Sequence, residues 1–99
     1  MTMPLDDELA KLAKALAHPV RVQIVRLLSE RGTCVRSDLS DELPVSETTA
    51  WQHLKVLKDA GVIKGDIDGP KLCYCLNDQV LARLAALVEA VIPTTNRKQ

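Results

Sequence analysis

The sequence predicts a mainly α-helical fold with a small β-wing: a winged helix-turn-helix of the α+β class, with the element order ααβααββα. Three observations carry this prediction. Apolar residues recur at steps of three and four over much of the chain, which indicates amphipathic helices. A brief helix is followed by a second helix with a strong start signal at Ser46. An Asp-Gly pair then separates two strand-like runs, as in a β-hairpin.

The composition fits one small domain built on aliphatic side chains. The 99 residues are 46% hydrophobic but only 2% aromatic, with no Phe, so Leu, Val, Ile and Ala must form the core. We expect one domain over residues 5–92, near the size at which a partner subunit adds stability, and a polar tail over residues 93–99. No apolar run approaches the roughly 18 residues of a membrane span, which predicts a cytoplasmic protein with no membrane partner.

The first two helices are predicted from their apolar faces and from the break between them. One runs from Leu5 to Leu16, with carboxylates in its first turn, where the helix dipole favours them. It ends near His18, because a residue that precedes a proline avoids the helical region. The next helix runs from Pro19 to about Glu30, and Gly32 ends it.

A second pair of helices follows a short β-prone stretch at residues 33–35. A brief helix over residues 37–43 is closed by Pro44. The helix after it begins at its N-cap Ser46, runs to about Ala60 and ends at Gly61.

The chain ends in a hairpin and a long helix. Two strand-like runs, residues 62–67 and 71–76, flank Asp68-Gly69. Asn77 and Asp78 can cap a last helix that extends to about Ile92. The apolar band of that helix is wider than one core-facing stripe requires, so part of it should pack on another subunit.

A winged helix-turn-helix predicts binding to double-stranded DNA, with the helix that begins at Ser46 in the major groove. Polar side chains near its start can pair with bases, and lysines along it and in the wing can contact phosphates. The predicted DNA-contacting residues are Ser46, Glu47, Thr48, Thr49, Trp51, Gln52, His53, Lys55, Lys58, Lys64 and Lys71. With 13 basic and 13 acidic residues, no overall field draws the chain to DNA, so the contact must be local. A generic helical domain with a merely solvated polar face is the alternative.

Three stretches of the sequence resemble the arsenic-repressor (ArsR/SmtB) family: residues 15–21 (ALAHPVR), 45–49 (VSETT) and 53–63 (HLKVLKDAGVI). The similarity extends from Leu5 to Val91, and the His-Leu-Lys-x-Leu-x-x-Ala-Gly run is fairly specific to this family. The resemblance implies a homodimeric transcriptional repressor, without an obligatory cofactor, that leaves operator DNA when a metal ion, metalloid or oxidant reacts with it.

The same resemblance implies that the first and last helices form the dimer interface. The residues expected there are Leu5, Leu9, Leu12, Leu81, Leu84 and Val88. Trp51 departs from the family, which usually has a small polar residue at that position. Its indole either acts at the DNA, by contacting a thymine methyl group or reshaping the footprint, or packs under the wing, and the sequence leaves both roles open.

The inducer sites that the family uses are incomplete in this chain. Its zinc sites take His and carboxylate pairs on the last helix, but residues 77–92 contain no His. Another site uses a Cys-Val-Cys-Asp-Leu run. The corresponding residues 34–39 read CVRSDL, with Arg36 where a second cysteine might stand.

Strand geometry suggests how the cysteine site, of which this chain keeps Cys34, could be completed. Alternation along a strand turns Tyr74 toward the core and both Cys73 and Cys75 away from it. The short strand at Val35 should pair with this strand, and opposed side chains have Cβ atoms about 4.5–5.5 Å apart. Cys34, Cys73 and Cys75 are therefore predicted to share one thiophilic ion, trivalent arsenic or antimony, because three thiolates suit such a centre better than zinc.

Other interpretations stay open. Free cysteines are often small, semi-buried hydrophobic residues. A redox sensor would instead join Cys34 to Cys73 or Cys75 in a disulfide. A winged helix that binds only proteins, with no inducer, also fits the neutral charge. An enzyme is not expected, because the sequence has no phosphate-binding glycine loop, no paired His-Glu metal motif and no nucleophile with a recognisable base.

Overall fold

The computed structural model describes residues 3–93, and it confirms the winged helix-turn-helix. The elements are α1 (Pro4–Ala15), α2 (Pro19–Arg31), the 3-10 helix η1 (Ser40–Glu42), α3 (Glu47–Asp59), β1 (Ile63–Asp66), β2 (Cys73–Leu76) and α4 (Asp78–Val91). Over residues 3–93, no helix has the length and apolar content needed to cross a bilayer. The polar tail predicted over residues 93–99 lies, apart from Pro93, outside the described residues.

The first predicted strand and the third predicted helix are shorter than expected. Val35 pairs with β2 through an isolated bridge to Tyr74, rather than through a regular strand. The segment before Pro44 forms η1 instead of an α-helix. The side chain of Asp38 accepts a hydrogen bond from the amide of Ser40 at 2.8 Å, and such a local turn competes with helix formation.

Helices α2 and α3 begin at side-chain caps. The hydroxyl of Ser46 accepts the amide hydrogen of Thr49 at 3.2 Å, which confirms the predicted N-cap of α3. At α2, Nδ1 of His18 accepts the amide hydrogen of Val20 at 3.1 Å. The sequence predicted a helix break at His18 but not this cap.

Strands β1 and β2 form an antiparallel hairpin, the wing, in which Gly65 lies opposite Tyr74 and Lys64 lies opposite Cys75. Tyr74 also exchanges two backbone hydrogen bonds with Val35, at 2.7 and 3.0 Å. The Tyr74 side chain is 0% exposed, so alternation turns it into the core as predicted. It thereby anchors β2 between β1 and the segment that leads to η1.

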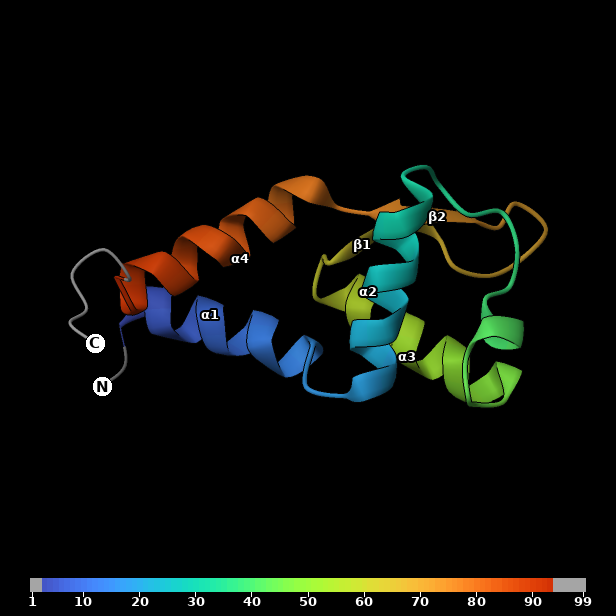
Figure 1. The fold of residues 1–99 in the computed structure, drawn as a ribbon, viewed down its shortest axis with the longest axis horizontal. Coiled ribbons are helices and arrows are strands. Elements are labelled where there is room, and N and C mark those ends of the chain that lie inside the picture. The colour runs from blue at the N-terminus through green and yellow to red at the C-terminus, as the bar shows by residue number, and fades with distance from the viewer. Residues whose placement is uncertain (1–2, 94–99) are drawn as a thin grey trace.

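The molecule has two ends of different shape. Helices α1 and α4 lie side by side and project as an arm, while α2, α3 and the wing gather at the other end (Figure 1). Arg83 of α4 donates two hydrogen bonds to the Glu8 carboxylate of α1, both at 2.8 Å. The buried core is continuous from Leu12 in the α1/α4 arm to Leu57 in α3. The arm and the helix-turn-helix end therefore belong to one packed unit.

Candidate nucleic-acid interface and thiol pair

One side of α3 is buried and the other is exposed and polar. The buried stripe follows helical spacing and consists of Ala50, Leu54 and Leu57. The exposed stripe, at steps of three and four, consists of Thr48, Trp51, Gln52 and Lys55. The exposed stripe begins at the N-terminus of the helix, where the predicted base-contacting residues stand.

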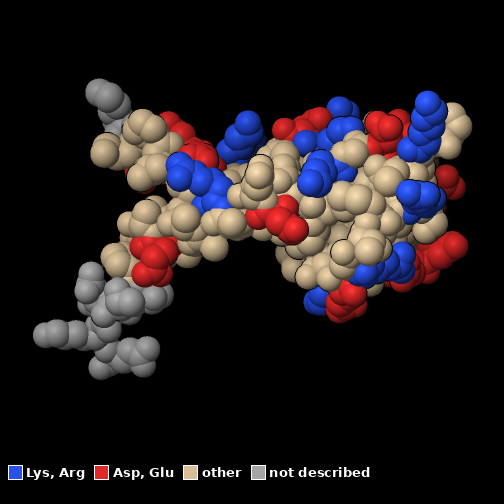
Figure 2. Space-filling view, turned by 90° about the horizontal axis from the view of Figure 1, so that it is seen from above, with Lys and Arg blue, Asp and Glu red and all other residues tan. Residues whose placement is uncertain are grey.

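The lysines near this surface are partly engaged within the chain. Nζ of Lys55 forms an ion pair with Asp59 at 2.9 Å, and Nζ of Lys58 donates to the carbonyl of Gly65 in the wing. Lys64 and Lys71 are exposed on the wing and the turn beside it. Figure 2 shows the molecule from above relative to the view of Figure 1, and on that face basic and acidic side chains are interspersed. Neither sign of charge dominates this face, which agrees with the neutral composition of the chain.

His53, one of the predicted DNA-contacting residues, has its ring engaged within the chain. Nδ1 of His53 lies 3.2 Å from Nη1 of Arg21, and the His53 ring lies 4.3 Å, centroid to centroid, from that of His18. The ring is half-buried against α2 and faces away from the exposed stripe. A sequence signal existed, because His53 falls at helical spacing between Ala50 and Leu57 and so shares their stripe.

Arg21 of α2 connects three helices. Its Nε donates to the carbonyl of Ala15 at the end of α1, at 2.7 Å. Its Nη1 must also be the donor to His53, because a guanidinium has no acceptor. This contact fixes the tautomer of His53, with its proton on Nε2. The guanidinium thus links the end of α1 to α3.

Burial, together with the charges of His18 and Arg21, lowers the pKa of His53 below its usual value. The folded state therefore favours the neutral ring. As the pH falls, His53 takes up a proton in the unfolded chain before it does so in the folded chain. The contribution of His53 to the free energy of unfolding is therefore complete above the pKa of the unfolded chain and is lost as the pH drops through the pKa of the folded chain.

We expect a His53→Gln variant to lose less stability than the wild type between about pH 8 and pH 5. The amide oxygen of Gln can accept from Arg21 without taking up a proton. Urea unfolding at each pH measures the free energy of unfolding of both proteins. Because both carry the same carboxylates, the effect of carboxylate titration cancels in the difference. Identical losses in both proteins would contradict the role of His53.

Trp51 lies at the edge of a cavity of about 450 Å³ between α3 and the turn of the wing. Ile67, Leu72 and Tyr74 also line this cavity. The indole is 38% exposed. Of its two predicted roles, packing under the wing is the one that this placement supports.

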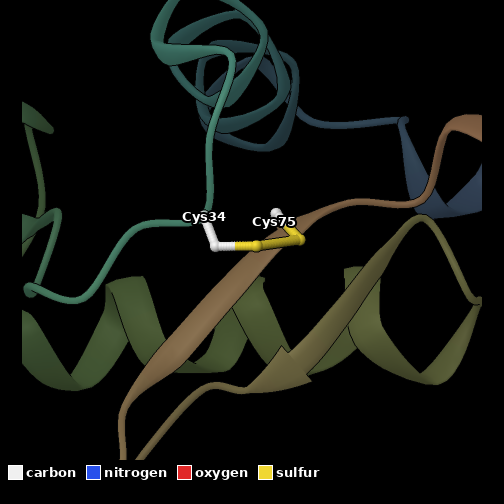
Figure 3. The surroundings of a disulfide bond; sticks show 2 residues. All are labelled: Cys34 and Cys75. Atoms are coloured by element: carbon white, nitrogen blue, oxygen red, sulfur yellow. A yellow bond between two sulfur atoms is a disulfide. The ribbon is translucent and has the colours of Figure 1, made fainter.

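Cys34 and Cys75 are joined in a disulfide that links the segment after α2 to strand β2 (Figure 3). Val35 and Tyr74 form the hydrogen-bonded pair, so Cys34 and Cys75 occupy the next, non-hydrogen-bonded position of the ladder. Such positions bring Cα atoms to about 4.5 Å, and here the Cα atoms are 4.3 Å apart. Backbone pairing alone therefore places the two sulfur atoms together.

Cys73 shares the outward face of β2 but does not join the other two cysteines. It is a half-buried free thiol. The antiparallel register through Val35 and Tyr74 places Arg36, rather than a cysteine, opposite it. Across residues 3–93, no group of three or more His, Cys, Asp or Glu side chains is arranged to hold a metal ion. The structure thus brings together two of the three predicted sulfur ligands.

The residues predicted for the dimer interface differ in their exposure. Leu5 and Val88 are 44% and 41% exposed on the α1/α4 arm. Leu9, Leu81 and Leu84 are partly buried against the core. Leu12 is only 6% exposed, so it packs inside its own chain and is not available to a partner.

Comparison with known proteins identifies the family. The profile described as "Bacterial regulatory protein, arsR family" matches residues 18–64, which include α2, α3 and the start of the wing. The chain is 44% identical, over 79% of its length, to the HTH-type transcriptional repressor SmtB of Mycobacterium tuberculosis. It spans 57% of that relative's length.

Two solved structures share the fold. An ArsR-like transcriptional regulator from Rhodococcus sp. RHA1 superposes with a TM-score of 0.73 and 27% identity, over 90% of this chain and 83% of that one. Rv0081 of M. tuberculosis gives a TM-score of 0.65 and 33% identity, over 95% and 94%. Proteins of this family are transcriptional regulators and not enzymes, which confirms the prediction from the sequence that no enzyme is expected. The chain belongs to the arsR family of bacterial regulatory proteins.

Proposed function

We propose that this chain is a homodimeric, cytoplasmic repressor that binds double-stranded operator DNA and leaves it when trivalent arsenic or antimony binds Cys34, Cys75 and Cys73. The observation that carries this proposal is the cross-strand position of Cys34 and Cys75. One cysteine stands on the segment that leads to α3, and the other stands on the wing. A ligand of both thiols can therefore act on both DNA-contacting elements.

The exposed stripe of α3 supports DNA binding. Gln52 can pair bidentately with adenine, and Thr48 can serve a base or a phosphate. The first turn of α3 presents backbone amides that favour a phosphate. Lys64 and Lys71 extend the contact along the wing. Because few cations contact the phosphates, the logarithm of the operator affinity should fall with the logarithm of the salt concentration along a shallow slope.

The α1/α4 arm supports a dimer. Five apolar side chains on these helices and at their caps are between 41% and 66% exposed: Met3, Leu5, Val88, Val91 and Ile92. Apolar side chains that gather on one part of a small protein mark an interaction surface. A second copy of the same arm is the partner that twofold symmetry provides.

The inducer site would assemble when the disulfide is reduced. Cys34 and Cys75 then offer two soft thiolates, and Cys73 lies one diagonal step from Cys34 across the ladder. Side chains at such diagonal positions are about 7–8 Å apart, so the third sulfur must turn toward the ion. Trivalent arsenic accepts three sulfur ligands. Drawing these sulfurs together would shift the wing relative to α3.

Oxidation is a second candidate signal, and the disulfide itself favours it. Forming the Cys34–Cys75 bond from two thiols releases two protons and gives two electrons to an oxidant such as a peroxide. The bond fixes the wing strand to the segment before η1. Cys73 takes no part in it, so this residue separates the two signals.

We predict that arsenite lowers the operator affinity of the reduced wild type by about five- to 150-fold, the usual range for coupled sites. A gel shift with the promoter of its own gene, at several salt concentrations, measures this effect. Cys73→Ser should blunt the response to arsenite and leave any response to peroxide intact, whereas Cys75→Ser should abolish both. Unchanged affinity with both reagents would refute control through these thiols.

A further inference from the structure

A cavity of about 350 Å³ opens beside the Cys34–Cys75 disulfide, between the end of α2, the wing and the start of α4. Both cysteines line it, together with Ser29, Thr33, Lys64 and Asp78. Its volume lies at the lower end of the range for small-molecule sites, about 300–1,000 Å³. A small molecule in this cavity would therefore lie against the disulfide.

The walls of this cavity, which we call the disulfide cavity, carry one charge of each sign. Lys64 is the register partner of Cys75 on β1, so its side chain stands beside the Cys75 sulfur. Asp78 is the first residue of α4. Both side chains belong to exposed residues, and neither forms an ion pair with another residue in the described range 3–93. A ligand with a carboxylate and an ammonium group would complement both.

We propose that the disulfide cavity binds a small thiol of the cysteine type, with an ammonium and a carboxylate group, and that this thiol reduces the Cys34–Cys75 disulfide. The proposal rests on thiol control of the proposed repressor, because only the reduced pair can take up a metalloid. The carboxylate of the small thiol faces Lys64, and its ammonium faces Asp78.

The reduction proceeds in two exchanges. The thiolate of the first small molecule attacks the sulfur of Cys34, which is the more exposed cysteine. A mixed disulfide forms, the bond between Cys34 and Cys75 breaks, and Cys75 leaves as a thiolate beside the Lys64 ammonium. A nearby cation stabilises such a leaving group. A second small thiolate then attacks the small molecule's own sulfur, which releases a small disulfide and the Cys34 thiolate. Both protein thiolates take up protons from water.

The test compares four thiols on the oxidised, full-length protein without DNA. Cysteine carries both charges, cysteamine carries only the ammonium, 3-mercaptopropionate carries only the carboxylate, and 2-mercaptoethanol carries neither. Alkylation and mass spectrometry over time give the rate of reduction. Each rate is divided by the rate at which the same thiol reduces hydroxyethyl disulfide, which removes differences in intrinsic reactivity.

We expect cysteine to have the highest normalised rate, about two- to fivefold above 2-mercaptoethanol for each charge that it matches. Lys64→Gln removes the cation beside the leaving Cys75 and should slow all four thiols, but it should slow cysteine and 3-mercaptopropionate by a larger factor than cysteamine and 2-mercaptoethanol. Asp78→Asn should slow cysteine and cysteamine but not 3-mercaptopropionate. Circular dichroism of both variants checks that the fold is retained.

Equal normalised rates for all four thiols would overturn the proposal, and so would variants that slow every thiol alike. An oxidised protein that is not two hydrogen atoms lighter than the reduced protein would overturn it as well, because the disulfide would then be absent. None of these readouts involves DNA. If the reduced protein without arsenite fails to bind its operator in the gel shift, the proposed repressor is refuted. Equal thiol rates together with intact arsenite release would refute this inference alone.

Discussion

Replacing Tyr74 by alanine is expected to lower the free energy of unfolding by about 3–5 kcal/mol, the usual range when a large core side chain is removed. The side chain is 0% exposed, and its hydroxyl donates to the carbonyl of Ser37 at 3.1 Å. The residue also pairs through its backbone with Val35 and Gly65. The loss is large compared with the total stability of a small domain, about 5–15 kcal/mol. Urea unfolding followed by circular dichroism measures it.

Tyr74→Phe is the matched control, because it keeps the ring and removes only the hydrogen bond. We expect a loss of about 0.5–1.5 kcal/mol from this variant. Burial raises the pKa of Tyr74 to about 12, and Asp38 adds to the shift. Wild-type stability should therefore decline as the pH rises from the unfolded pKa of about 10 toward this value. Tyr74 is the one tyrosine of the chain, so its ultraviolet absorbance reports the titration directly. A Tyr74→Ala protein as stable as the Phe variant would contradict the central place of this ring.

Replacing Gly65 by alanine should disrupt the wing. Gly65 has a φ of 102°, which favours glycine, and an added Cβ would overlap the carbonyl oxygen of Cys73 and lie 3.0 Å from Cα of Tyr74. Strained backbone costs about 1–3 kcal/mol, and forced repacking adds a similar amount. We expect a loss of about 2–6 kcal/mol together with a shifted register at Cys75. The disulfide should then form more slowly under mild peroxide.

Gly69→Ala separates the clash from the backbone strain. Gly69 also has a positive φ, 80°, but an added Cβ there meets no atom within 4 Å. This variant should lose only the strain energy and should form the disulfide at the wild-type rate. Unfolding in urea and mass spectrometry after oxidation give both quantities. Equal behaviour of the two alanine variants would show that the close approach of β1 and β2 at Gly65 is unimportant.

Local patterns in the sequence predicted most of the fold. Helical spacing placed the buried stripe of α3, and the N-cap at Ser46 placed its start. The Asp-Gly pair placed the wing, and strand alternation turned Tyr74 inward and the cysteines outward. Each of these features depends on neighbours within a few residues, which is why the sequence alone carries them.

The parts of the site that the sequence did not predict depend on long-range packing. Arg21 of α2 contacts His53 of α3, and these two residues are 32 positions apart in the sequence. The choice between Cys73 and Cys75 as the partner of Cys34 depends on the register at Val35, which one bridge sets. A shift of two residues would have paired Cys34 with Cys73 instead. Strand periodicity places both cysteines on the outward face but does not distinguish between them.

The disulfide also changes the connectivity of the chain. Cys34 and Cys75 are 41 positions apart, and the segment between them contains η1, α3, β1 and the turn of the wing. In the oxidised form this segment is a covalently closed ring, and α1 with α2 on one side and α4 on the other are the two tails attached to it. Closing a ring of this size removes about 4 kcal/mol of entropy, as TΔS, from the unfolded chain in the loop-closure account. A protease that cuts once inside the ring would open it but leave the oxidised molecule as one covalent unit, and the two fragments would come apart only after reduction.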